Sequence, residues 1–206
     1  MDIIKCECCG GTKMQKQGQN LMVCSFCGSV YLLDENEKIV SQSVTDAKVF
    51  ALYLKAEEFR QANNILDEIQ ILTQALELDE GKAITWVKLG RAYRSGNAFD
   101  KAIECYNKAI EIAPDYPQNY ANIGAVYLIK SDYAAALPFY EKAVSLISKE
   151  DTDYPTTLAN YAVAVAKTGD KRKAAKLINE AEKRGYQYGA DARKVSGLSA
   201  FSKLFH

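Results

Sequence analysis

The chain has 206 residues, of which 48% are hydrophobic and 25% are charged, so it can bury a sizeable core in one or two domains. Lysine and arginine together number 26, as do aspartate and glutamate, and this balance excludes a general electrostatic attraction to nucleic acid or anionic lipid. The first residues lack the basic start, apolar segment and cleavage site of a signal peptide, and no apolar stretch has the length of a membrane span. We therefore expect a cytoplasmic protein.

Four cysteines near the N-terminus form two matching pairs, Cys6 with Cys9 and Cys24 with Cys27, each with two residues between the thiols. Each pair can hold a tetrahedral metal ion from one tight turn, while the chain between the pairs returns as a hairpin. In a reducing compartment this pattern favours metal ligation over disulfides, and four thiolates suit zinc, with iron as the alternative. The pattern resembles a zinc ribbon over residues 1–33, which implies one structural Zn²⁺ ion bound by these four cysteines.

Two apolar runs around the second cysteine pair, residues 21–23 and 30–33, predict short β-strands. The next stretch, residues 34–45, is polar and is expected to be a linker. Thr45 or Asp46 would cap the helix that follows, because a side-chain oxygen at that position accepts a hydrogen bond from the first backbone amides of a helix.

From residue 83 the sequence repeats with a period of about 34 residues, which is typical of stacked helix pairs. Large residues three and four positions apart form an apolar stripe on the first helix of each repeat, and a small residue at the eighth position lets the second helix approach closely. Residues 49–82 and 155–188 are weaker copies, and the first of these carries Glu68 where the other repeats have alanine. The clearest repeat, 83–116, has this set at Trp86, Leu89, Gly90, Tyr93, Ala102, Tyr106, Ala109 and Pro114, and 117–150 follows it at Tyr120, Ile123, Gly124, Tyr127, Ala136, Tyr140 and Ala143.

This spacing resembles the tetratricopeptide repeat (TPR) family over about residues 49–188. The resemblance implies a mainly α fold: a right-handed TPR superhelix, or α-α solenoid, of about four helix pairs with a C-terminal cap helix, preceded by the small N-terminal β zinc ribbon. Pro138 lies well inside a second helix, where we expect a local kink and not a break. The domains are then the ribbon at 1–33, the linker at 34–45, the TPR array at 46–188 with repeats at 49–82, 83–116, 117–150 and 155–188, and a capping segment at 189–206.

In TPR proteins the first helices of successive repeats line a concave groove, and the resemblance implies which side chains of this chain face a peptide or protein ligand there. Arginines in the groove would attract an acidic side chain or a C-terminal carboxylate, and asparagine amides can hold the backbone of an extended peptide. The lysine and asparagine pattern of the carboxylate-clamp members, which bind chaperone tails, is matched only at Asn122. The partner-binding candidates are Tyr53, Arg60, Val87, Arg91, Arg94, Asn122, Ala125, Leu128 and Asn160.

The function that these features predict is partner binding without catalysis. The sequence shows no nucleophile–base pair, P-loop or Rossmann fingerprint, and a closed four-cysteine site has no open position for a substrate water. We expect a cytoplasmic adaptor or scaffold that binds a peptide or protein segment in the TPR groove, with the ribbon as a structural or second docking module. The alternative is a nucleic-acid-associated regulator whose ribbon contacts DNA or RNA, although residues 1–40 have a slight acidic excess and not the basic surface that this role needs.

Overall fold

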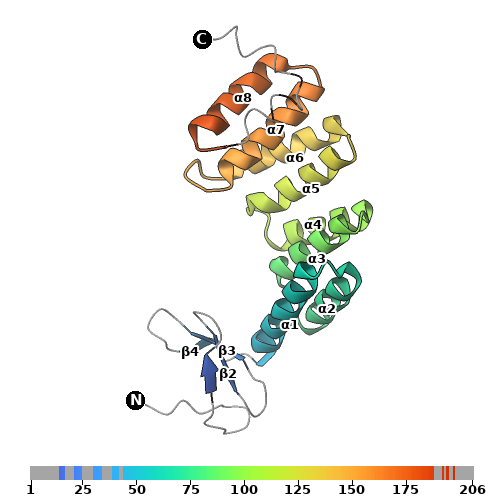
Figure 1. Ribbon diagram of the computed structural model, residues 1–206, viewed down its shortest axis with the longest axis vertical. Helices are drawn as coiled ribbons and strands as arrows, with labels where there is room; N and C mark the ends of the chain where they lie inside the picture. Colours follow the sequence, from blue (N-terminus) through green and yellow to red (C-terminus); the bar gives the residue numbers. More distant parts are fainter. Residues whose placement is uncertain are drawn as a thin grey trace. The chain divides into compact units, whose positions relative to one another are not determined.

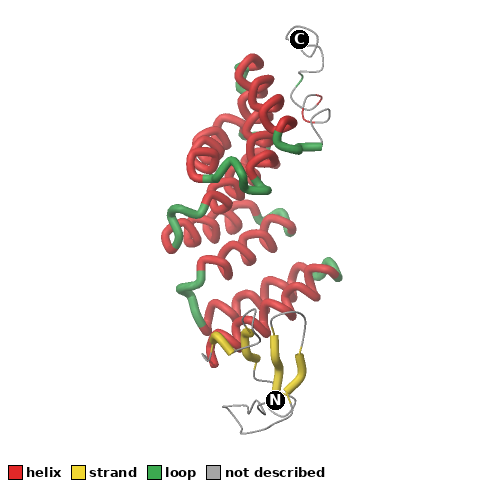
Figure 2. The backbone as a smooth tube through the Cα atoms, turned by 90° about the vertical axis from the view of Figure 1, so that its left-hand side faces the viewer, coloured by secondary structure: helices red, strands yellow, loops and turns green. Residues whose placement is uncertain are grey.

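The computed structural model describes residues 14–16, 21–24, 30–33, 39–41 and 44–187, together with Ala192, Lys194 and Gly197. The chain divides into two compact units, a first unit of residues 1–96 and a second unit of residues 97–206. Within the described residues, strands occur only near the N-terminus and helices make up most of the remainder, as Figure 2 shows. None of these described helices is both long and apolar enough to cross a lipid bilayer.

Four short strands form an antiparallel sheet at the beginning of the first unit, in the order β1-β2-β3-β4. Each strand pairs with the next along the chain, and Met22 lies opposite Tyr31, whose side chain is buried. The two predicted strands around the second cysteine pair are confirmed as β2 and β3. The strands are β1 (Met14–Lys16), β2 (Leu21–Cys24), β3 (Val30–Leu33) and β4 (Ile39–Ser41).

The structure differs from the sequence prediction in the segment 34–45, which was expected to be a linker. Strand β4 lies inside this segment and pairs with β3, with Ile39 opposite Leu33. Pairing satisfies backbone groups at that edge of the sheet, and the β-branched pair Ile39 and Val40 suits a strand. Helix α1 then begins at Val44, before the predicted capping residues, so little of the segment is left to connect sheet and helix.

Three helices complete the first unit: α1 (Val44–Gln61), α2 (Ile65–Leu78) and α3 (Ala83–Ser95). Helix α1 packs against α2 and against strand β3, and α2 packs against α3 (Figure 1). The turn between α1 and α2 contains Asn63 at a φ of 55°, and the side chain of Asn64 accepts a hydrogen bond from the amide of Asp67. Asparagine tolerates this left-handed backbone and caps helices well, so this short turn follows from its residues.

Five helices form the described core of the second unit, each packed against the next (Figure 1). Asp132 and Asp170 cap two of them by accepting backbone hydrogen bonds, and the helix that contains Pro138 is continuous through it. The eight helices of the described residues agree with the predicted array of helix pairs, and the mainly helical prediction is confirmed. They are α4 (Phe99–Ile112), α5 (Pro117–Ile129), α6 (Tyr133–Leu146), α7 (Tyr154–Lys167) and α8 (Lys171–Lys183).

The close approach predicted for the small eighth position of a repeat is present between α5 and α6. A Cβ atom added at Gly124 would lie 2.8 Å from the ring of Tyr140, a distance that real Cβ contacts do not reach. Tyr140 is fully buried, so its ring has no solvent space into which it can move. Glycine is therefore required here by packing.

A second packing device lies at the third position of the repeats, where Thr85, Asn119 and Thr157 are buried polar residues. The Asn119 amide donates to the backbone carbonyls of Ala109 and Ala113 at 3.2 Å each, and thereby joins the start of α5 to the end of α4. The Ala109 carbonyl also accepts the backbone amide of Ala113 at 2.9 Å, so the Asn119 side chain adds a second donor at the end of α4. The sequence pattern of large and small residues did not reveal this role.

The predicted capping segment, residues 189–206, lies mostly outside the described residues. Of the three residues described there, Ala192 is buried and belongs to the same apolar cluster as Tyr161 and Ile178. The cap helix as a whole stays a prediction.

Candidate functional site

A small pocket lies among the three helices of the first unit, and we call it the α1–α3 pocket. It receives side chains from α1 and α3, the first helices of two successive repeats, and from α2 beneath them. Tyr53, Glu57 and Arg60 share one face of α1 because residues four and three positions apart lie above one another on a helix. The lining residues are Tyr53, Ala56, Glu57, Arg60, Glu68, Leu72, Lys88 and Arg91.

Arg60, predicted to attract a ligand carboxylate, already has a carboxylate partner within its own helix. Its Nε donates to Oε2 of Glu57 at 2.8 Å, and its Nη2 donates to the other oxygen. The hydrogen bonds from Arg60 lower the pKa of Glu57 to about 2, so the pair is ionised at neutral pH. The charge of Arg60 is thus largely balanced before any ligand arrives. The i, i+3 spacing of the two residues is the sequence signal that reveals this pair.

Lys88 and Arg91 supply the other positive charges of the pocket from α3. The Nζ atom of Lys88 lies 5.3 Å from the centre of the Tyr53 ring, and burial lowers the pKa of this lysine. Arg91 is half-buried, and no carboxylate of the described residues forms an ion pair with it. The Tyr53 hydroxyl forms a hydrogen bond with the Thr85 hydroxyl, which ties α1 to α3 at the edge of the pocket.

Glu68 reaches the pocket from α2, and its side chain is only 5% exposed. Within the described part of the chain, no group donates a hydrogen bond to its carboxylate or pairs with it. Burial raises the pKa of Glu68, and the positive charges of Arg60 and Arg91 offset this effect only in part. In the sequence, the only sign of this residue was a glutamate at a position where the other repeats have alanine. That this glutamate is buried in the same pocket as these cations is seen only in the structure.

The other predicted partner-binding residues are not gathered in this pocket. Val87 is 8% exposed and offers little surface to a ligand, whereas Arg94 is partly exposed near the end of α3. Four predicted residues of α5 and α7 belong to the second unit, so a single groove through all four repeats stays a prediction. These four are partly exposed: Asn122, Ala125, Leu128 and Asn160.

The predicted metal ligands fall largely outside the described residues. Cys6, Cys9 and Cys27 are not described, whereas Cys24 is the last residue of β2, opposite Met14 and directly before the β2–β3 connection. No cluster of histidine, cysteine, aspartate or glutamate in the described residues is arranged to hold a metal ion. Cys105, by contrast, is buried in α4, and burial raises the pKa of its thiol to about 11.

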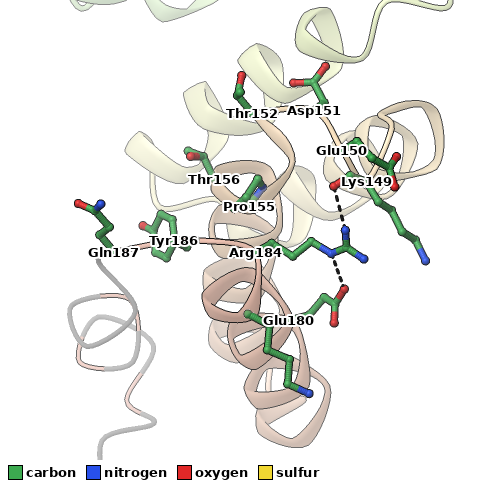
Figure 3. A pocket seen from close by; sticks show the side chains of 12 residues that line it. Lys149, Glu150, Asp151, Thr152, Pro155, Thr156, Glu180, Arg184, Tyr186 and Gln187 are labelled. Carbon is green, nitrogen blue, oxygen red and sulfur yellow. Dashed lines mark hydrogen bonds and ion pairs between the residues drawn. The ribbon is translucent and has the colours of Figure 1, made fainter.

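A larger pocket, about 710 Å³, lies in the second unit beside the short insertion that precedes the last repeat (Figure 3). Arg184 joins its two sides: Nε donates to Glu180 at 2.9 Å, and Nη1 donates to the carbonyl of Lys149 at 3.1 Å. The guanidinium also lies 5.6 Å from the centre of the Tyr154 ring. The remaining charged side chains of the lining, Lys183, Glu150 and Asp151 among them, mix both signs, so this pocket favours no ligand charge.

Two family models match the helical part of the chain. A TPR repeat model matches residues 90–130, and a tetratricopeptide repeat model matches residues 117–184. Residues 90–184 therefore match tetratricopeptide repeat models, as the spacing of the repeats predicted. No curated protein matches the sequence.

Several solved structures have a similar fold at low sequence identity. The crystal structure of MamA has a TM-score of 0.58 at 19% identity and covers 75% of this chain and 85% of that chain. YrrB, described as a TPR protein with an unusual peptide-binding site, has a TM-score of 0.57 at 20% identity and covers 71% of this chain and 73% of that chain. A mutant O-GlcNAc transferase of Thermobaculum terrenum has a TM-score of 0.61 at 17% identity, covering 70% of this chain and 27% of that chain. At these identities the likeness establishes the fold alone.

Proposed function

We propose that the protein is a cytoplasmic, non-enzymatic adaptor that binds an acidic peptide or protein segment along the first helices of its TPR array. The observation that carries this proposal is the α1–α3 pocket, where Lys88 and Arg91 present positive charge on a surface formed by two successive repeats. Guanidinium groups bind carboxylates with two parallel hydrogen bonds, which gives both affinity and orientation. The proposal is supported by YrrB, a structure of similar fold that is described as having a peptide-binding site.

The partner's carboxylate would meet Arg91 and Lys88 first, because Arg60 is already paired with Glu57. Arg94 lies one helical turn beyond Arg91 and would attract a second acidic group of the same segment. In the second unit, the amides of Asn122 and Asn160 would bind the backbone of an extended peptide.

The N-terminal sheet is proposed to carry one structural zinc ion, held by Cys6, Cys9, Cys24 and Cys27. The place of Cys24 at the end of a strand, before a hairpin connection, suits a ligand that approaches the metal from a turn. Four thiolates also suit iron, so the identity of the metal is part of the proposal. The ribbon would stabilise the N-terminal sheet or act as a second docking module.

The partner-binding proposal is tested by reversing the two arginines of α3. Arg91→Glu combined with Arg94→Glu should abolish capture of an acidic segment, because both cations become repulsive. Proteins captured from native lysate by the wild-type chain and by the variant are compared by mass spectrometry, and circular dichroism checks that helix content is unchanged.

A matched control reverses two exposed cations elsewhere, with Arg172→Glu and Lys176→Glu on α8. This control changes the net charge by the same amount and should retain the partner. Capture that survives the α3 reversal, or is lost equally in the α8 control, would place the binding site elsewhere.

A further inference from the structure

Glu68 is a buried acidic residue that has no role in the partner binding described so far. It stands on α2, at the repeat position that Ala102, Ala136 and Ala174 occupy in the other three repeats. An alanine there is fully buried in each of those repeats. The first repeat instead places a carboxyl group at the base of the α1–α3 pocket, with no hydrogen-bond donor from the described residues.

The charges that face Glu68 come from both helices packed over it. From α1 come Glu57 and Arg60, which pair with each other, and from α3 come Lys88 and Arg91. The net charge that the pocket offers to a ligand is therefore positive, with a single buried acidic group beneath two cations. Lys88 and Arg91 would repel a cationic ligand and attract a carboxylate.

We propose that the α1–α3 pocket is a proton-linked carboxylate site, in which Glu68 takes up one proton when a partner's carboxylate docks against Lys88 and Arg91. This inference rests on the proposed function and adds the chemistry of the site to it. The proton comes from solvent and binds a carboxylate oxygen of Glu68, and no covalent bond to the partner forms. The protonated Glu68 can then donate its O–H toward the docked carboxylate, directly or through one water molecule in the pocket.

The proton uptake follows from placing two carboxyl groups side by side. A second negative charge within a few ångströms raises the pKa of a carboxyl group strongly, as in pairs of carboxylates that share one site. Burial has already raised the pKa of Glu68 in the free protein, and the docked carboxylate raises it further. The space within the pocket is about 10 Å³, room for about one water molecule, so a ligand carboxylate would dock at the mouth of the pocket against Lys88 and Arg91, with at most one water between it and Glu68.

The increase in the pKa of Glu68 on binding determines how the affinity for the ligand depends on pH. Because Glu68 has a higher pKa in the complex than in the free protein, binding strengthens as the pH falls through the interval between the two values. The sequence contains a single histidine, His206, so few other groups titrate between about pH 5.5 and 7.5.

The test uses the full-length protein and a fluorescein-labelled tetra-aspartate peptide with a free C-terminal carboxylate. Its carboxylates stay ionised above about pH 5, since aspartate titrates near 4. Fluorescence anisotropy at constant ionic strength should show a dissociation constant that rises by about threefold or more from pH 5.5 to 7.5, and by at most about tenfold per pH unit, the limit for one proton. Calorimetry in two buffers of different ionisation enthalpy should detect the proton uptake directly.

Two variants of the same residue isolate its role. Glu68→Gln keeps the shape but cannot titrate, and Glu68→Ala restores the residue of the other repeats. Both should make peptide binding independent of pH and at least as tight as wild type at pH 7.5. Glu77→Gln, an exposed glutamate on the same helix, should behave as wild type.

Several outcomes would overturn the proposal. If Glu68→Gln and Glu68→Ala both lose the peptide at every pH while folding normally, Glu68 accepts a hydrogen bond from the ligand and is not a proton acceptor. If His206→Gln removes the pH dependence, the linkage lies at that residue. Binding that is independent of pH but lost in the Arg91 and Arg94 reversal keeps the adaptor proposal and removes the proton linkage. Binding that ignores the arginine reversal, or its complete absence in wild type, removes the carboxylate site itself.

Discussion

At the residue scale, single side chains decide which helices approach and which charges remain available. Gly124 permits the contact between α5 and the ring of Tyr140, and the amide of Asn119 connects α5 to the end of α4. The glycine could be predicted, because a small residue recurs at the eighth position of every repeat. The roles of Asn119 and Glu68 could not, because each depends on atoms contributed by a neighbouring helix.

Replacing Gly124 by alanine should destabilise the second unit. Alanine is the better helix former by about 1 kcal/mol, but overpacking a closed core costs about 1–3 kcal/mol, and the Tyr140 ring has no free space. We expect a lower midpoint of urea unfolding for Gly124→Ala. In a Tyr140→Leu background the same change should be neutral or stabilising, because the clash is gone. Equal effects of Gly124→Ala in both backgrounds would mean that the ring does not cause the loss.

At the scale of elements, hydrogen bonds between side chains join successive helices. Tyr161 of α7 donates to Glu141 of α6 at 2.6 Å and accepts from Lys173 of α8 at 2.5 Å. These contacts unite three helices at a point where Tyr161 is buried. The helices themselves were predictable from the spacing of large residues, whereas β4 was not, because Ile39–Ser41 is short and its partner β3 defines it.

The contact among these three helices predicts how stability depends on pH. The hydrogen bond from Tyr161 and the proximity of Lys173 hold the pKa of Glu141 below its usual value of 4.5. A lowered carboxyl pKa contributes stability that is present above about pH 4.5 and is lost as the pH falls through the folded-state value. Tyr161→Phe should therefore lower the melting temperature at pH 7, and the difference from wild type should narrow by pH 3.

Thermal melts of wild type and Tyr161→Phe at high pH test the contribution of Lys173 to stability. Its pKa is raised chiefly by the hydrogen bond with Tyr161, so its contribution is present at pH 7 and is lost only as the pH rises through that raised value. If the difference in melting temperature between wild type and Tyr161→Phe stays constant from pH 7 to pH 3, the ionisation of Glu141 does not contribute to stability through this contact.

At the scale of the whole molecule, the sequence separates a cysteine-containing N-terminal module from an array of helix pairs. The described helices, α1 to α8, contain none of the four predicted metal ligands. If the cysteines bind zinc, the metal should stabilise the N-terminal sheet and leave most of the helical structure unchanged.

Metal analysis provides the corresponding prediction. Protein purified under reducing conditions should contain about one zinc ion per chain, since four thiolates form one closed tetrahedral site. Cys24→Ser with Cys27→Ser should remove the metal while the helical circular dichroism signal persists, and Cys105→Ser, a buried thiol of α4, should leave the metal content unchanged. Metal-free wild-type protein, or equal loss in the Cys105 control, would contradict the predicted ligand set.

The period of the repeats and the spacing of the cysteines are local patterns in the sequence. They were sufficient to predict the helix pairs, their apolar faces and a metal-bound module. The structure alone established that β4 extends the sheet, that Val87 is buried, and that Glu68 is a buried residue of the pocket that Lys88 and Arg91 also line. The physical reason is that burial and charge environment are properties of neighbouring side chains, and these neighbours come from strands and helices far apart in the sequence.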